Sequence, residues 1–164
     1  MSALVIGYGN PLRQDDGAGW AVVDALEQDC PNLRVKSLKA HQLTPELIIE
    51  FQDMSLVVFV DACVSIMSGM VVTWELTPIA VADRGFTHHC KPEHMLHQAR
   101  ELYGARPRGV MVTIGAERLE FGDDLSPTVQ QAVSRAARSI KSLIETGANP
   151  LHRWAFQHQE AKEA

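Results

Sequence analysis

The segment SLVVFV at residues 55–60, in which one serine precedes five apolar residues, constrains the fold of this 164-residue chain more than any other feature. It is rich in β-branched and aromatic residues, which favour a strand, and it lacks the polar alternation of a strand with one solvated face. A strand that is buried on both faces belongs inside a mainly parallel sheet covered by helices. The segment therefore predicts an α/β fold.

The rest of the chain alternates between strand-like and helix-like segments. Short apolar runs predict strands, and apolar residues at helical spacing, bounded by proline or glycine, predict helices. The predicted strands are 4–7, 34–38, 71–76 and 109–115, and the predicted helices are 18–28, 45–54, 92–103 and 126–146. This order predicts one three-layer α/β/α domain with a mostly parallel, twisted sheet of about five strands. We expect the domain to cover residues 1–148 and a polar C-terminal tail to follow at 149–164.

Charge and composition disfavour several classes of protein. The net charge is −5, with Lys and Arg spread along the chain, which disfavours binding to nucleic acid. No apolar run approaches the ~20 residues that span a bilayer, and no basic segment with a cleavage site opens the chain. The three cysteines (Cys30, Cys63 and Cys90) are odd in number and lack CxxC spacing, so a disulfide framework or structural zinc site is not expected. We expect a cytoplasmic protein, without membrane contact, whose amphipathic helices favour a monomer.

The first loop, GYGNPLRQDDGAG at residues 7–19, carries two adjacent carboxylates. It lacks the third glycine of a dinucleotide fingerprint and places acidic groups where a pyrophosphate needs positive potential, so we expect no organic cofactor. Asp15 could cap the following helix, and Asp16 could complement its dipole. A second carboxylate is not needed to cap one helix, so Asp16 is the better candidate for a functional role.

Two further candidates come from later segments. Asp61 directly follows the central strand, where ligands of parallel sheets bind, although it could also cap the amides of a turn. His88 and His89 lie in the polar sequence FTHHC, and such residues are often only solvated. Carboxylates together with a neutral imidazole would suit zinc, nickel or iron. Because neither GxSxG nor HExxH occurs, the residues alone predict only two carboxylates and one histidine at one sheet edge.

Four segments together resemble one known family, the hydrogenase maturation endopeptidases. They are GYGNPLRQDDGAG, VVFVDAC, THH before the helix that begins at Pro92, and GVMVTIGAERLEFGDDLSPTVQQAV. The resemblance extends from residue 4 to about residue 144, and its first and last motifs are the most specific. It implies a protease with the α/β fold predicted above.

The resemblance also implies a substrate and a set of site residues. Members of this family remove a C-terminal extension from the large-subunit precursor of a nickel–iron hydrogenase after nickel has been inserted. Carried over by motif, the residues that recognise the nickel are Asp16, Asp61 and His88, with His89 as the rival for the last role. The nickel would be supplied by the precursor, which is the expected partner.

One segment departs from the pattern of many relatives. The second predicted strand runs into KAHQLTPEL at residues 39–47 instead of an Asp-Gly-Gly turn, which resembles the branch that serves bidirectional, NAD-linked hydrogenases. In that branch His41 and Gln42 would line the cleft. Two alternatives stay open: a peptidase with its own metal ion and another substrate, and a non-catalytic, nickel-responsive chaperone of hydrogenase assembly.

Overall fold

The computed structural model describes residues 2–81 and 90–148, and within these residues five strands form one sheet. The strands are β1 (Ala3–Tyr8), β2 (Val35–Ala40), β3 (Leu56–Cys63), β4 (Val71–Leu76) and β5 (Arg108–Gly115), in the order β2-β1-β3-β5-β4. All neighbours pair in parallel except β4 and β5. The short connection 64–70 contains no helix, so the chain turns back and β4 runs antiparallel. The predicted mostly parallel α/β sheet is confirmed.

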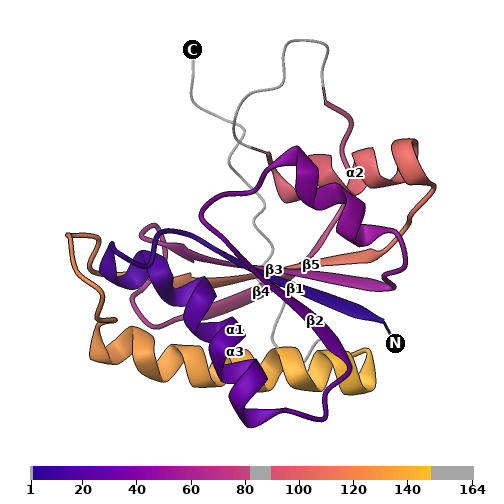
Figure 1. Cartoon of the computed structure of the whole chain (residues 1–164). Helices are drawn as coiled ribbons and strands as arrows, with labels where there is room; N and C mark the ends of the chain where they lie inside the picture. Colours follow the sequence, from indigo (N-terminus) through magenta and orange to yellow (C-terminus); the bar gives the residue numbers. More distant parts are fainter. Residues whose placement is uncertain (1, 82–89, 149–164) are drawn as a thin grey trace.

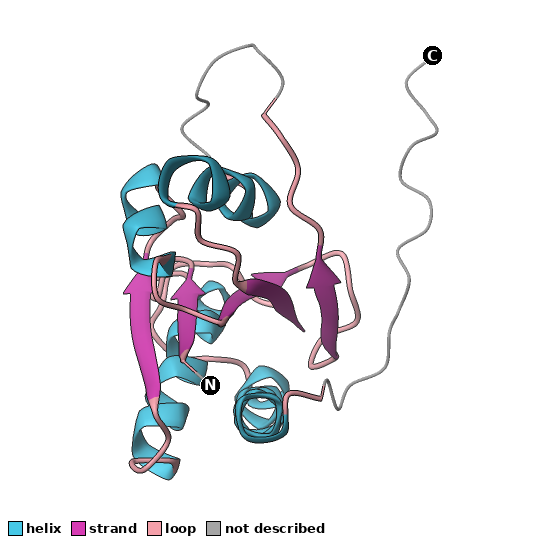
Figure 2. Ribbon diagram, turned by 90° about the vertical axis from the view of Figure 1, so that its right-hand side faces the viewer, coloured by secondary structure: helices cyan, strands magenta, loops and turns pink. Residues whose placement is uncertain are grey.

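Helices cover both faces of this sheet (Figures 1 and 2). On one face lie α1 (Ala18–Asp29) and α3 (Pro127–Thr146), and on the other lie the 3₁₀ helix η2 (Pro45–Phe51) and α2 (Pro92–Tyr103). Successive side chains of a strand point to opposite faces. Val58 and Val60 of β3 accordingly join the core on the α1/α3 side, whereas Val57 and Phe59 join the core on the α2 side. The central strand is buried on both faces, as its sequence predicted.

The segment predicted as a helix over 45–54 is instead a 3₁₀ helix that ends at Phe51. The amide of Leu47 donates to the carbonyl of Thr44, the i→i+3 bond of this geometry. The fully packed residues of the segment, Ile48 and Phe51, are three positions apart. In a 3₁₀ helix, with three residues per turn, this spacing places both side chains on the same face, toward the core.

The ends of the two later helices agree with the sequence. Both α2 and α3 have proline at the start, and they are followed by left-handed glycines, Gly104 with φ 67° and Gly147 with φ 72°. Glycine adopts this conformation without a steric penalty and ends a helix there. Among the helices of residues 2–81 and 90–148, none is both long and apolar enough to cross a membrane.

Candidate functional site

Asp61 lies near the carboxyl end of β3, in register with Thr113 of β5. Its Oδ1 accepts a hydrogen bond of 2.8 Å from the amide of Ala62. Burial raises the pKa of Asp61 to about 6, and the nearby negative charge of Asp16 also raises it, while hydrogen bonds from Ala62 and Tyr8 act in the opposite direction. The surroundings of this carboxylate therefore disfavour its charged form.

Asp16 approaches Asp61 from the short 3₁₀ helix η1 (Gln14–Gly17), which connects β1 to α1. Its Oδ2 accepts a hydrogen bond of 2.9 Å from the amide of Asn10 in the same loop. The loop is compact, and a Cβ on Gly9, whose φ is 132°, would lie 2.1 Å from the carbonyl oxygen of Asp16. Only glycine therefore fits at this position. The structure thus brings together Asp16 and Asp61, two of the residues predicted from the sequence. A pair of like charges that is partly removed from water favours a cationic ligand between them.

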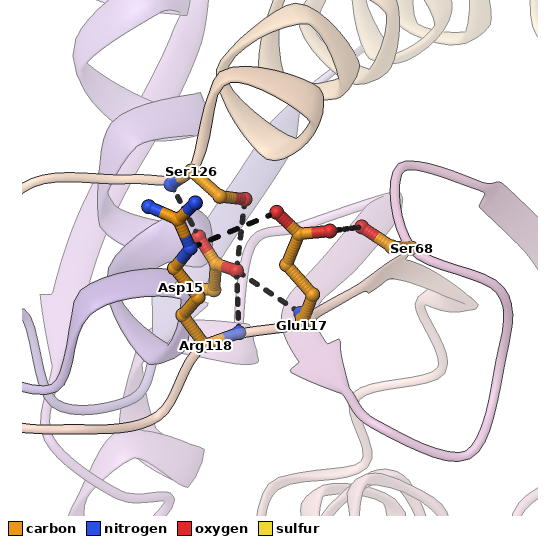
Figure 3. Close-up of polar contacts among 5 residues, drawn as sticks. All are labelled: Asp15, Ser68, Glu117, Arg118 and Ser126. Atoms are coloured by element: carbon orange, nitrogen blue, oxygen red, sulfur yellow. Dashed lines mark hydrogen bonds and ion pairs between the residues drawn. The ribbon is translucent and has the colours of Figure 1, made fainter.

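Asp15, in contrast, does not cap α1, whose N-cap residue Gly17 has no side-chain cap. The Asp15 side chain is fully buried and accepts hydrogen bonds from the amides of Glu117 and Arg118, at 3.0 and 2.9 Å. It also accepts bonds from the amide and the hydroxyl of Ser126 (Figure 3). The two neighbouring aspartates therefore have different environments, and Asp15 anchors the first loop to the segment before α3.

The third sequence candidate, His88, and its rival His89 lie outside the described residues. Across residues 2–81 and 90–148, no group of three His, Cys, Asp or Glu side chains could hold a metal ion. Burial raises the pKa of the Cys90 thiol, and the charge of Glu46 raises it further, which disfavours a reactive thiolate. Within the described part of the chain, the sequence candidates at this edge are the two carboxylates of Asp16 and Asp61.

The segment KAHQLTPEL at residues 39–47 begins at the same edge of the sheet. His41 follows the end of β2 and is exposed, as is Gln42. The His41 ring lies 5.1 Å from the ring of Trp20, whose Nε1 donates to the carbonyl of Ala40 at 2.9 Å. The structure holds His41 on the rim of the carboxyl edge, and its contribution to the site stays a prediction.

One functional candidate was missed by the sequence reasoning. Tyr8 ends β1, and a hydrogen bond between its hydroxyl and Asp61 lowers the pKa of Asp61. Its position at the carboxyl end of a parallel strand was the available signal.

Two exposed apolar side chains lie at the first loop, Leu12 within it and Phe121 next to it. Phe121 is 86% exposed and Leu12 is 53% exposed. Their backbones adjoin, because the amide of Gly122 donates to the carbonyl of Leu12 at 2.9 Å and the amide of Gln14 donates to the carbonyl of Gly122 at 2.8 Å. Two exposed apolar side chains are therefore carried by neighbouring backbone segments at this loop.

Similar folds occur among solved structures. Hydrogenase maturating endopeptidase HybD from Escherichia coli is 24% identical, with a TM-score of 0.65 over 90% of this chain and 94% of that one. The nickel–iron hydrogenase maturation protease HycI from Thermococcus kodakarensis is 19% identical, with a TM-score of 0.69 over 88% and 92%. A hydrogenase 2 maturation peptidase from a Thaumarchaeota archaeon is 23% identical, with a TM-score of 0.64 over 90% and 99%.

These similarities show that the chain has the fold of the hydrogenase maturation endopeptidases over nearly its whole length. At the level of sequence, no protein-family model matches the chain. No curated protein matches it either.

Proposed function

We propose that this chain is a hydrogenase maturation endopeptidase that removes the C-terminal extension from a nickel–iron hydrogenase large-subunit precursor after nickel insertion. The observation that carries the proposal is the pair of carboxylates, Asp16 and Asp61, at the carboxyl edge of a sheet with this fold. Ligands of open α/β sheets bind at that edge. The names of the solved structures with this fold, which are hydrogenase maturation proteases, support the same reading.

In the proposed reaction, the nickel belongs to the substrate, and the chain recognises it through Asp16, Asp61 and His88 or His89. Each described carboxylate is oriented by one backbone amide, that of Asn10 or Ala62. A cation between the carboxylates would relieve the repulsion that contributes to the raised pKa of Asp61. Only a nickel-loaded precursor would gain this stabilisation of the complex, so an empty precursor would bind more weakly.

The chain's own residues would then hold the precursor with its scissile bond in a fixed place. Such positioning is worth several kcal/mol when the geometry is productive. Nickel in the precursor would also polarise a carbonyl or activate a water molecule as a Lewis acid. The exposed side chains of Leu12 and Phe121 support a protein substrate that covers this edge, rather than a small molecule. A cytoplasmic location and a monomeric state are part of the proposal.

The test is a cleavage assay on the large-subunit precursor from the same organism, prepared with and without nickel. We expect the wild-type chain to release a C-terminal peptide only from the nickel-loaded form. Asp16→Asn and Asp61→Asn should each lower the rate by roughly two orders of magnitude or more. Comparing His88→Ala with His89→Ala identifies the histidine. Asp53→Asn, which removes an exposed carboxylate before the start of β3, at the opposite edge of the sheet, is the matched control.

Each other outcome favours a different function. Equal cleavage of both precursor forms would contradict recognition of nickel and favour a peptidase that holds its own ion. Docking to the nickel-loaded precursor without cleavage would favour an assembly chaperone. If the chain neither binds nor cuts the precursor, the proposed function is wrong.

A further inference from the structure

Tyr8 and Asp61 are lateral neighbours on adjacent strands. The parallel register of β1 and β3 pairs Gly7 with Val60, so the next residue of each strand, Tyr8 and Asp61, continues the same row. Tyr8 packs with the apolar cluster on the α2 side of the sheet. Asp61 is two positions after Phe59, which belongs to the same cluster, and therefore shares its face. Both side chains leave the sheet on one face at its carboxyl edge.

The hydroxyl of Tyr8 is a hydrogen-bond donor, and the neighbouring carboxylate of Asp61 accepts this bond. A second acidic group near the hydroxyl, Glu93, comes from the first turn of α2.

We propose that Tyr8 is a positioning residue whose hydroxyl holds the Asp61 carboxylate in the orientation that precursor processing requires. The inference rests on the function proposed above. The Oδ1 of Asp61 already accepts the amide of Ala62, which comes from its own strand. The Tyr8 hydroxyl adds a restraint from the neighbouring strand. Two donors from different directions restrict rotation of the carboxylate, so its remaining lone pairs keep one direction.

The phenyl ring of Tyr8 has a separate, structural role. It is packed against the apolar cluster under α2, and its hydroxyl also lies 4.0 Å from the sulfur of Met111. Phenylalanine would preserve the packing of the ring and would remove only the hydroxyl. Tyr8→Phe therefore separates positioning of Asp61 from the filling of the core.

The experiment compares Tyr8→Phe with Tyr103→Phe in steady-state cleavage of the nickel-loaded precursor. Tyr103 is the only other tyrosine of the chain and is exposed at the end of α2, so its variant is a chemically matched control. For Tyr8→Phe we expect kcat to fall by roughly 10- to 100-fold, because loss of a group that orients a ligand has effects of this size. KM should rise by a smaller factor than kcat falls, because the docking surface is intact and only the contact of Asp61 with the nickel is weakened. Tyr103→Phe should behave as wild type.

Two kinetic results would overturn the inference: an unchanged kcat, or a loss that falls on KM alone. A crystal structure of Tyr8→Phe gives a second readout that does not depend on activity. We expect the Asp61 carboxylate to occupy more than one orientation in the variant and one orientation in the wild type. A single, unchanged orientation would overturn the inference. If the wild-type chain does not cut the precursor, the proposed function fails, while the crystal structures still decide whether Tyr8 orients Asp61.

Discussion

The carboxylate of Asp15 accepts two hydrogen bonds from Ser126, one from its amide at 2.7 Å and one from its hydroxyl at 3.0 Å. Ser126 is the N-cap residue of α3, but its hydroxyl donates to Asp15 and does not cap the helix. Because Asp15 also accepts the amides of Glu117 and Arg118, one buried carboxylate joins the first loop to two places on the segment before α3. The backbone that carries Asp16 is thereby fixed.

Asp15→Asn should strongly destabilise the protein. The amide group can donate but replaces one of the two acceptor oxygens, so it would face donors that Asp15 now satisfies. Loss of charge-assisted bonds at a fully buried site should lower the free energy of unfolding by roughly 3 kcal/mol or more. Urea unfolding measures this loss. Asp123→Asn, at an exposed position, should change stability by less than about 0.5 kcal/mol; equal effects would mean that the Asp15 network contributes little.

Asp15 should also contribute to the acid sensitivity of the fold. Burial alone would raise its pKa, but the hydrogen bonds from Ser126, Glu117 and Arg118 outweigh burial, and the pKa lies below the usual value of an aspartate. A lowered folded-state pKa stabilises the protein above the unfolded-state pKa, and this stabilisation is lost as pH falls through the folded-state value. The stability of the wild type should therefore decline below about pH 4, more steeply than that of Asp15→Asn. Parallel curves would contradict the assignment.

The sign is opposite for Asp61, because its pKa is raised from 3.8 to about 6. Its contribution to stability is fully present below pH 3.8 and is lost as pH rises through about 6. Asp61→Asn should therefore be more stable than the wild type at pH 8, by up to about 2 kcal/mol, while it loses activity. The difference should shrink near pH 4. A variant that is less stable than the wild type at pH 8 would show that Asp61 is a structural residue.

Asp16→Asn should lower the pKa of Asp61. The negative charge of Asp16 is one cause of the raised value, but burial is the larger cause, so the pKa should stay above 3.8. Carbon-detected NMR titration of the Asp61 carboxyl group measures the change. Asp24→Asn is a suitable control, because Asp24 of α1 forms its ion pair with Lys39 of β2. If both variants leave the pKa of Asp61 unchanged, the two carboxylates do not interact as the structure indicates.

Phe121→Ser should weaken recognition of the precursor without affecting the fold. The side chain is 86% exposed, so its loss removes little buried surface from the folded chain. If it anchors the protein substrate, KM should rise by about tenfold, as for an aromatic group at an interface, with kcat almost unchanged. Leu102→Ser, at a 67% exposed position on α2, is the control. Equal effects of the two variants would indicate general loss of apolar surface.

Local sequence was sufficient for much of the fold. The segment 55–60 revealed a strand buried on both faces because five consecutive apolar residues leave no face for water. The ends of α2 and α3 could be predicted because Gly104 and Gly147 adopt the left-handed conformation, which other residues rarely adopt. Asp61 could be placed at the carboxyl edge because strand direction follows from the order of strands and helices. For the strand and the helix ends the physical cause lies within a few neighbouring residues, and for Asp61 it lies in the order of the elements.

Tertiary structure decided what depends on distant partners. Sequence alone favoured Asp16 over Asp15 for function, but it could not show what Asp15 does, because the groups that bind Asp15 are more than a hundred residues away, at Glu117, Arg118 and Ser126. The contact of Tyr8 with Asp61 followed from the register of β1 and β3. Residue patterns determine which segments form strands and helices, whereas register and packing determine which side chains meet, because those contacts exist only after the layers have assembled.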